Sequence, residues 1–306
     1  MESSWTAHSA TASSAQHAGS LAGRRVLITG PARGIGERTA RLAAARGARL
    51  GLIGLEPQRL AALAGDLGEG HHWAECDVTN QHSLNDAVAS TAAALGGIDA
   101  VVANAGIGGT YTVAGGSVDG MIRVVDVNLS GVIRTVSATL PHLIEARGYA
   151  LLISSAAAFT AMPGMAAYCA SKAGVEQFGN VLRLETAHLG VAVGTAHPIW
   201  IDTDLVRSFS DAAPSFEDAR RKLPWPLNSL ISVDQCAEAF VHAIARRQRK
   251  VYVPRTMGAV QALRTFTLGR LGGRLTSRVT GGGAFVARLE QEAHATDTAL
   301  TRDHAG

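Results

Sequence analysis

Short apolar runs alternate along the chain with segments rich in helix-forming residues. An apolar run of four to six residues that ends at glycine or a polar side chain is typical of a strand buried on both faces. Such runs predict strands at residues 25–29, 49–54, 73–76, 98–103, 150–154, 191–196 and 251–254.

The segments between these runs carry Ala-rich faces and helix-ending glycines, which predict helices. We expect helices at residues 37–46, 58–67, 83–95, 118–146 and 168–188. Strands and helices that alternate in this way predict an α/β fold, a doubly wound parallel sheet with helices on both faces. No strand-rich or helix-only block stands apart, so residues 21–254 are expected to form one domain.

Residues 205–230 interrupt this alternation with three prolines and several aromatic side chains, and they predict a loop or lid. Their apolar side chains would either enclose a hydrophobic substrate, such as a steroid, retinoid, terpenoid or long-chain keto compound, or pack on the body of the protein. Both interpretations stay open at this point. The side chains concerned are Leu205, Phe209, Phe216, Trp225, Leu227 and Leu230.

The segment 255–286 mixes leucine, phenylalanine and arginine, and it predicts one or two amphipathic helices. Such helices could cover a substrate pocket, pack in a subunit interface or lie on a membrane surface. Packing on protein is the favoured interpretation and membrane contact the less favoured one. Residues 290–306 are polar and expected to be frayed. Residues 1–20 are expected to form a mobile tail, since they lack the basic start and apolar stretch of a signal peptide.

Composition excludes several classes of protein. Hydrophobic residues make up 47% and charged residues 17% of the 306 residues, which suits a packed core rather than a disordered chain. The net charge is only +3, and the densest basic group, at 246–250, is typical of a solvated helix end, so no nucleic-acid partner is expected. The three cysteines have neither metal-ligand nor disulfide spacing, and no segment reaches the ~20 apolar residues of a membrane span. The sequence therefore predicts a cytoplasmic protein without a metal site.

A glycine-rich turn joins the first predicted strand to the first predicted helix, in the sequence TGPARGIG at residues 29–36. Glycine lets the backbone approach a ligand, and a helix N-terminus presents free N–H groups to a phosphate. A turn of this kind in the first βα unit predicts a dinucleotide pyrophosphate site. Its candidate contacts are Gly30, Arg33, Gly34, Ile35 and Gly36.

The end of the second predicted strand distinguishes NAD from NADP. A carboxylate there binds the ribose hydroxyls, whereas a basic group suits the 2′-phosphate. The strand ends in Gly54 and Leu55 without an acid, and Arg33 in the glycine turn could meet a 2′-phosphate. NADP is therefore favoured, with NAD bound through Glu56 as the alternative.

Further motifs follow in order. Asp77 and Val78 come after the third strand, Asn104, Ala105 and Gly106 after the fourth, and Asn128, Ser155, Tyr168 and Lys172 follow. Together with the glycine turn, they resemble the short-chain dehydrogenase/reductase family over residues 21–254. The resemblance implies a Rossmann-type fold and hydride transfer between NAD(P) and an alcohol or ketone. It implies adenine contacts from Asp77 and Val78, a contact of Lys172 with the nicotinamide ribose, and nicotinamide contacts from Ile201 and Thr203. It also implies that Asn104, Ala105, Gly106 and Tyr168 are cofactor contacts. It also implies a homodimer or homotetramer built through the helices around Asn128 and Tyr168.

The spacing of the candidate catalytic residues agrees with this chemistry. Tyr168 and Lys172 are four residues apart and share one helix face. A lysine ammonium and the oxidised nicotinamide would lower the tyrosine pKa from ~10, so that Tyr168 could exchange a proton with the substrate. Ser155 would hydrogen-bond the substrate oxygen, with Ser154 as the neighbouring alternative. In the family, the residue at the position of Asn128 supports a water chain to the lysine.

One segment departs from the family pattern. Where the family has Pro-Gly after the sixth strand, this chain has Pro198 and Ile199, which changes the backbone freedom of the loop. His197 could be a second acid/base group, although a structural role is favoured.

The leading functional hypothesis is an NAD(P)-dependent dehydrogenase or reductase in which Tyr168 is the acid/base. The alternatives are a catalytically silent dinucleotide-binding regulator of the same fold, and an isomerase or lyase that recycles a bound cofactor. A regulator would be expected to lose the tyrosine or the lysine, and this chain keeps both.

Overall fold

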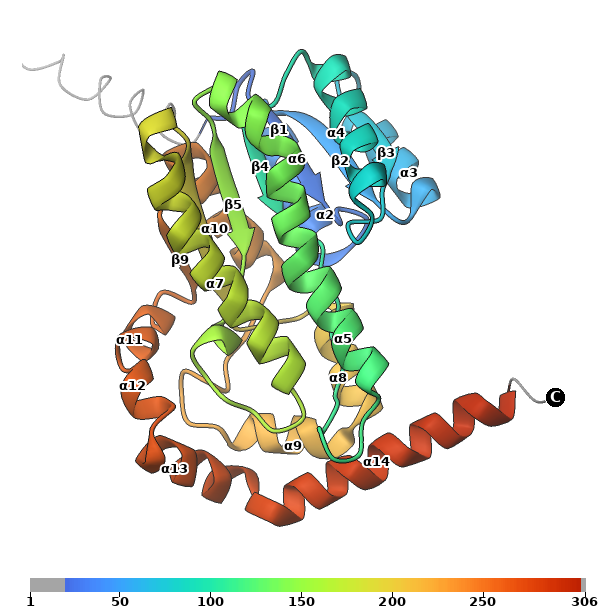
Figure 1. Cartoon of the computed structure of the whole chain (residues 1–306), viewed down its shortest axis with the longest axis vertical. Helices are drawn as coiled ribbons and strands as arrows, with labels where there is room; N and C mark the ends of the chain where they lie inside the picture. The colour runs from blue at the N-terminus through green and yellow to red at the C-terminus, as the bar shows by residue number, and fades with distance from the viewer. Residues whose placement is uncertain (1–19, 304–306) are drawn as a thin grey trace, which may run out of the picture.

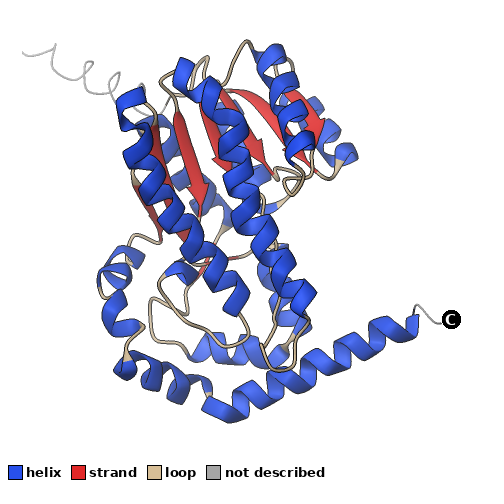
Figure 2. Ribbon diagram, viewed as in Figure 1, coloured by secondary structure: helices blue, strands red, loops and turns tan. Residues whose placement is uncertain are grey.

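A seven-stranded parallel sheet in the order β3-β2-β1-β4-β5-β6-β9 forms the centre of the molecule (Figures 1 and 2). The computed structural model describes residues 20–303, without the side chains of residues 210–212 and 293–303. Apart from Ser20, the expected N-terminal tail lies outside the described residues. The strands are β1 (Arg25–Thr29), β2 (Arg49–Gly54), β3 (His72–Glu75), β4 (Ala100–Ala103), β5 (Tyr149–Ile153), β6 (Ala192–Pro198) and β9 (Lys250–Val253). Each agrees with a predicted strand to within two residues at either end.

Helices cover both faces of the sheet, as Figure 2 shows. One face is covered by α2 (Gly34–Ala45), α3 (Pro57–Leu67) and α10 (Val233–Arg246), and the other by α4 (Gln81–Leu95), α6 (Gly131–Glu145) and α7 (Ala166–Thr186). Successive residues of β1 serve the two cores in turn: Val26 and Ile28 pack with the first set and Leu27 with the second. The doubly wound α/β fold is confirmed. The helix α10 was not predicted.

The long helical stretch predicted at residues 118–146 contains an interruption. It consists of α5 (Val118–Val125), a π-helical turn (Asp126–Ser130) and α6. Asn128 lies in the π-helical turn and is fully buried. Wide turns of this kind recur at functional sites, because they redirect a side chain that a regular helix would hold elsewhere.

Residues 205–230, predicted to be a loop or lid, are largely helical. The segment contains most of α8 (Asp204–Ala212) and all of α9 (Pro214–Lys222). It ends at β8 (Leu230–Ile231), which pairs in parallel with β7 (Trp200–Ile201), a strand that precedes the segment. Thr203 caps α8 by accepting a hydrogen bond from the Val206 N–H. Pro214 occupies the first turn of α9, where a proline without an N–H favours a helix start instead of breaking it. The prediction of a loop was therefore wrong.

Beyond β9 the described part of the chain forms a series of helices joined by short turns: α11 (Met257–Ala262), α12 (Arg264–Thr267), α13 (Arg270–Thr280) and α14 (Gly282–Asp303). The predicted fraying from residue 290 is corrected by α14, which starts at Gly282 and passes along α8 and α9 in Figure 1. Phe285 and Leu289 of α14 are buried in a cluster with Phe209 and Phe216, and this apolar contact anchors the helix. Among the helices that the structure describes, none is long and apolar enough to span a membrane.

Candidate active site

A cavity of about 1220 Å³ lies at the carboxyl ends of the strands. It extends from the glycine turn after β1, past the ends of β3, β4, β5 and β6, to α8 and the C-terminal helices. The strand order reverses between β1 and β4, and doubly wound sheets bind their ligands at this switch point. All the sequence-predicted cofactor contacts line this one cavity: Gly30, Arg33, Gly34, Ile35, Gly36, Glu56, Asp77, Val78, Asn104, Ala105, Gly106, Tyr168, Lys172, Ile201 and Thr203.

The glycine turn has the geometry that a pyrophosphate requires. Gly30 and Gly34 have φ values of +63° and +59°, which side-chain-bearing residues rarely adopt. A Cβ on Gly36 would lie 2.6 Å from Asn104 Nδ2 and closer still to the Gly30 carbonyl oxygen. The first turn of α2 has no side-chain cap, so its N–H groups can serve a ligand. The turn therefore fits a dinucleotide phosphate.

Asn104 holds the glycine turn in place through hydrogen bonds to its backbone. Its Nδ2 donates to the carbonyl oxygens of Thr29 and Gly30 at 3.0 and 3.1 Å. In return, Thr29 Oγ1 accepts from the backbone N–H groups of Asn104 and Ala105, both at 2.9 Å. The segment Asn104–Ala105–Gly106 thus ties the end of β4 to the glycine turn of β1.

The two residues expected to distinguish NAD from NADP form an ion pair. The Arg33 guanidinium donates to the Glu56 carboxylate at the end of β2, and Arg59 lies 4.0 Å from the same carboxylate. The carboxylate of Glu56 therefore has two arginines as neighbours, of which Arg33 lines the cavity.

Asp77 and Val78 follow β3 at the cavity wall. Thr79 donates to Asp77 Oδ1 through its N–H and its hydroxyl, at 2.8 and 2.7 Å. Although burial acts to raise it, these hydrogen bonds hold the pKa of Asp77 below its ordinary value. Asp77 is therefore a fixed, ionised acceptor.

Tyr168 and Lys172 lie one turn apart on α7, as predicted. Lys172 Nζ donates to the Ile153 carbonyl oxygen at 2.9 Å and lies 5.6 Å from the centre of the Tyr168 ring. Burial lowers the pKa of Lys172 to about 8. The Tyr168 ring packs edge-on against Phe209 of α8, with 6.0 Å between ring centres, so α8 helps to fix the tyrosine.

The chain's own groups act on the pKa of Tyr168 in opposite directions. Burial raises it to about 12, while a hydrogen bond with Ser155 acts in the opposite direction. The protein's own groups therefore keep Tyr168 protonated at neutral pH instead of lowering its pKa. The effect of burial outweighs that of the Ser155 hydrogen bond.

The two candidate serines have separate partners. Ser154 Oγ donates to the Lys172 carbonyl oxygen at 2.7 Å, which anchors the serine to α7. Ser155 Oγ accepts from the Ala157 N–H at 3.1 Å and lies 3.2 Å from the Pro198 carbonyl oxygen. Of the two, only Ser155 interacts with Tyr168 among the described contacts. The geometry favours Ser155 as the substrate contact.

Asn128 does not line the cavity. Its amide is paired with the backbone of Ile107: Oδ1 accepts from the N–H at 2.8 Å, and Nδ2 donates to the carbonyl oxygen at 2.9 Å. Nδ2 also lies 3.4 Å from Ser171 Oγ on α7. Asn128 therefore fastens the segment after β4 to the helix that carries Tyr168 and Lys172.

His197 is buried behind the site. Its ring stacks on Tyr252 with 5.4 Å between centres, and Nδ1 lies 3.3 Å from the Ser155 carbonyl oxygen. Burial lowers the pKa of His197 to about 4, so the ring is neutral at physiological pH. These contacts favour the structural role.

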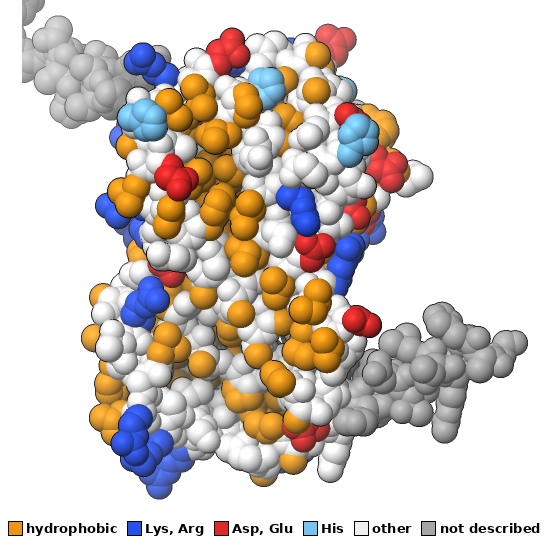
Figure 3. All heavy atoms as spheres, in the orientation of Figure 1, with side chains coloured by type: hydrophobic (Ala, Val, Ile, Leu, Met, Phe, Trp, Pro, Cys, Tyr) orange, Lys and Arg blue, Asp and Glu red, His pale blue; other side chains and the backbone are white. Residues whose placement is uncertain are grey.

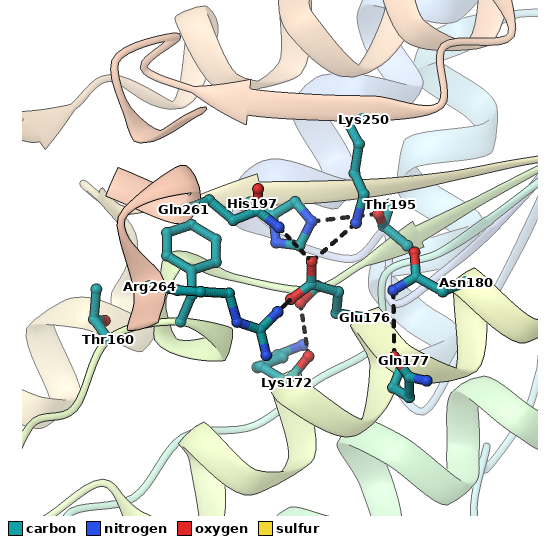
Figure 4. A network of polar contacts seen from close by, with 12 residues as sticks. Thr160, Lys172, Glu176, Gln177, Asn180, Thr195, His197, Lys250, Gln261 and Arg264 are labelled. Carbon is teal, nitrogen blue, oxygen red and sulfur yellow. Dashed lines mark hydrogen bonds and ion pairs between the residues drawn. The ribbon is translucent and has the colours of Figure 1, made fainter. Parts of the chain in front are cut away.

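A polar cluster lies next to the site, as Figure 4 shows, and no pattern in the sequence predicted it. Glu176 is buried on α7, one turn beyond Lys172, and its carboxylate accepts from Lys250 Nζ at 2.9 Å and Gln261 Nε2 at 3.0 Å. Arg264 Nη1 lies 3.7 Å away. This Glu176 cluster attaches α11 and α12 to the catalytic helix.

Residues of the C-terminal helices also form part of the cavity wall. The amphipathic pattern of residues 255–286 predicted three alternative roles, one of which was to cover a substrate pocket. In the structure these helices do cover part of the cavity. The lining residues from this segment include Val260, Leu263, Phe266, Leu275 and Val279. Among the described residues there is no group of three or more His, Cys, Asp or Glu side chains placed to hold a metal ion.

The short chain dehydrogenase family model matches residues 24–214, which include the glycine turn, Asn128, Ser155, Tyr168 and Lys172. The chain belongs to this family and is an oxidoreductase of the dehydrogenase/reductase class.

Relatives that align over more than two thirds of the chain include D-threitol dehydrogenase from Mycolicibacterium smegmatis, 34% identical over 72% of this chain and 85% of that protein. A second is 11-beta-hydroxysteroid dehydrogenase-like 6 from Arabidopsis thaliana, 29% identical over 80% of this chain and 74% of that protein. The crystal structure of a short-chain type dehydrogenase/reductase from Mycobacterium marinum is similar with a TM-score of 0.69 and 26% identity, over 76% of this chain and 95% of that one.

Proposed function

We propose that this protein is an NADP-dependent reductase of hydrophobic ketones, and of the corresponding secondary alcohols in reverse, with Tyr168 as the proton-transfer residue. One observation carries the proposal: a single cavity runs from the glycine turn, past Ser155 and Tyr168, to an apolar wall. Its volume exceeds the few hundred Å³ of an ordinary ligand pocket, as a site for a dinucleotide together with a substrate requires.

The choice of NADP rests on Arg33 and Arg59, which flank Glu56. A 2′-phosphate would compete with the Glu56 carboxylate for Arg33, and phosphate is a strong partner for a guanidinium. When bound, the cofactor supplies or accepts the hydride. On the protein, the glycine turn would hold its pyrophosphate, Asp77 and Val78 its adenine, and Lys172, Ile201 and Thr203 its nicotinamide end.

The chain's own residues would handle the proton. Ser155 Oγ would donate to the substrate oxygen and fix its position beside the Tyr168 hydroxyl. A phenol whose pKa is raised to about 12 is a proton donor at neutral pH, which suits the reduction of a carbonyl group. Lys172, held by the Ile153 carbonyl, would place a positive charge near the phenolate that remains.

The substrate class follows from the wall opposite the glycine turn. Thioether, aromatic and aliphatic side chains line it from the loop before α7, from α8, from the turn after α9, and from α11 and α12: Met162, Met165, Phe209, Leu223, Leu227, Val260 and Phe266. The relatives named above include a polyol dehydrogenase and a steroid dehydrogenase-like protein, so family membership does not fix the substrate. The apolar wall favours a hydrophobic ketone. α8 and α9 would act as its lid.

The test is a titration of the purified protein with NADPH and NADH, followed by turnover of hydrophobic ketones at 340 nm, with wild type compared to Tyr168→Phe. We expect preferential NADPH binding, and a loss of turnover of about 10²–10⁴-fold in the variant with cofactor affinity kept. Tight binding without turnover on any ketone or alcohol would favour the regulator instead. Turnover of substrate without net NADPH consumption would indicate an isomerase or lyase.

We also propose a homo-oligomer formed through α6 and α7. Their outer faces expose Ile133, Val181 and Leu184, the last with 79% of its surface accessible. Figure 3 shows a continuous apolar stripe on the face where α6 and α7 lie. A monomer in light scattering at micromolar concentration would refute this proposal, and Leu184→Arg is expected to dissociate the oligomer.

A further inference from the structure

The cavity has an apolar rim that is itself exposed. Leu263, Phe266 and Leu275 line the cavity, yet 59%, 52% and 52% of their surfaces are accessible. Trp225, from the turn after α9, also lines the cavity and is 72% accessible. Side chains that belong both to the wall and to the outer surface mark an opening. Burying them against an apolar phase would be favourable.

Beside this rim, α13 carries an apolar stripe and a basic stripe on adjacent faces. Leu271 and Leu275 are one turn apart and exposed, and Leu268 just before the helix is also exposed. Arg270, Arg274 and Arg278 follow one another at the same helical spacing and are exposed next to them. Within the part of the chain that the structure describes, no ion pair of these three arginines is found. Figure 3 shows the basic side chains gathered at the lower left of the molecule, where α13 lies.

The charge of the whole segment is one-sided. Residues 255–289 contain no Asp, Glu or Lys, whereas the complete chain is almost balanced, with 28 basic and 25 acidic residues. The arginines of this segment are Arg255, Arg264, Arg270, Arg274, Arg278 and Arg288. One of them, Arg264, is paired with the buried Glu176, so the basic stripe of α13 is a separate feature. Exposed leucines flanked by arginines without acids are typical of helices that lie on anionic membranes.

We propose that α12 and α13 dock the protein on the surface of an anionic lipid bilayer, with the apolar rim of the cavity facing the acyl chains. The arginines would meet the headgroup phosphates, and Trp225 would lie at the interface, where tryptophan is favoured. A second copy of this chain is less suited to bind this face. A two-fold contact would place the arginines of one copy against the same arginines of the other, and like charges repel. On the proposed function, a hydrophobic ketone could then enter the cavity from the bilayer.

The experiment is co-sedimentation of the full-length protein with vesicles of phosphatidylcholine containing phosphatidylserine, compared with vesicles of phosphatidylcholine alone, without substrate or cofactor. We expect binding to the anionic vesicles that weakens with added salt. The triple variant Arg270→Gln/Arg274→Gln/Arg278→Gln should bind about 100-fold more weakly. Leu268→Gln/Leu271→Gln, which alters no cavity-lining residue, should also weaken binding.

The matched control removes three arginines from the opposite end of the sheet, before β9: Arg246→Gln/Arg247→Gln/Arg249→Gln. It should bind as wild type does, and NADPH affinity measured for every variant verifies the fold. Absence of binding to anionic vesicles, or an equal loss in the control, would overturn the proposal. So would a change of oligomeric mass in Leu268→Gln/Leu271→Gln without vesicle binding, which would assign the face to a second copy. Because no turnover is measured, a failure here leaves the proposed oxidoreductase activity untouched.

Discussion

Gly36→Ala is the smallest change that should separate cofactor binding from folding. The added methyl group would lie 2.6 Å from Asn104 Nδ2 and 3.0 Å from Pro31 Cα, and closer still to the Gly30 carbonyl oxygen. Two of these three neighbours are backbone atoms of the glycine turn, so the turn must open to admit it. Overpacking of this kind costs about 1–3 kcal/mol, offset by about 1 kcal/mol because alanine is the better helix former. The free energy of unfolding should therefore fall by no more than about 2 kcal/mol.

The effect on the cofactor should be larger than the effect on folding. Opening the turn displaces both the Asn104 amide and the first N–H groups of α2, so we expect NADPH affinity to fall at least about tenfold, or ~1.4 kcal/mol. Affinity is measured by the change in NADPH fluorescence, and stability by urea unfolding without cofactor.

Gly65→Ala is the matched control. Gly65 also lies in a helix, α3, but nothing lies within 4 Å of its Cβ position, so the substitution should stabilise slightly and leave affinity unchanged. If Gly36→Ala bound NADPH as tightly as wild type, the assignment of this turn to the pyrophosphate would be wrong.

Three further outcomes are expected. Arg33→Ser should lower the affinity for NADPH by about tenfold or more and leave the affinity for NADH unchanged, both measured in the same titration. An equal loss of affinity for both cofactors would contradict the contact between Arg33 and the 2′-phosphate. Because burial raises the pKa of Tyr168, the kcat/KM for ketone reduction should be constant across neutral pH. The kcat/KM for alcohol oxidation should instead rise with pH, by up to about tenfold per pH unit. An oxidation rate independent of pH would argue against Tyr168 as the base. Glu176→Gln should lower the free energy of unfolding at pH 7 by about 1–3 kcal/mol, because it leaves Lys250 half-buried without its carboxylate. Lys250 and the neighbouring charges hold the folded pKa of Glu176 below its usual value against the effect of burial, so this stabilisation is present above the unfolded pKa and lost as pH falls through the folded one. Urea unfolding of both proteins at neutral and acidic pH should show the difference shrink in acid.

The central strands of the sheet were predictable because β1, β2, β4 and β5 are buried on both faces almost throughout. In β1, for example, Val26, Leu27 and Ile28 are consecutive apolar residues and all are buried, which is typical of a central strand of a parallel sheet. The glycine turn could also be predicted, because its glycines stand between a predicted strand and a predicted helix, as the motif requires. These local patterns were enough to place the predicted cofactor contacts around one cavity.

Other features depended on contacts between distant residues. Pro214 and Pro224 suggested a loop, but Pro214 begins α9, and packing of Phe216 against Phe209 and Phe285 holds the helices together. The Glu176 cluster joins positions up to 88 residues apart on α7, β9 and the C-terminal helices, and no local pattern marks it. The raised pKa of Tyr168 likewise depends on how completely other elements enclose its ring.

The Glu176 cluster also bears on how such an enzyme could evolve. The residues proposed to hold the cofactor and to carry the proton lie before residue 214, within the part of the chain that the family model matches. The outer wall of the cavity comes from α11 to α13, beyond that boundary, and it is attached to α7 through Gln261 and Arg264. The other side chains of α11 to α13 can therefore be substituted during evolution without changing the residues proposed for hydride and proton transfer. A new substrate range could be acquired by exchanging this one terminal segment while its two anchors are kept.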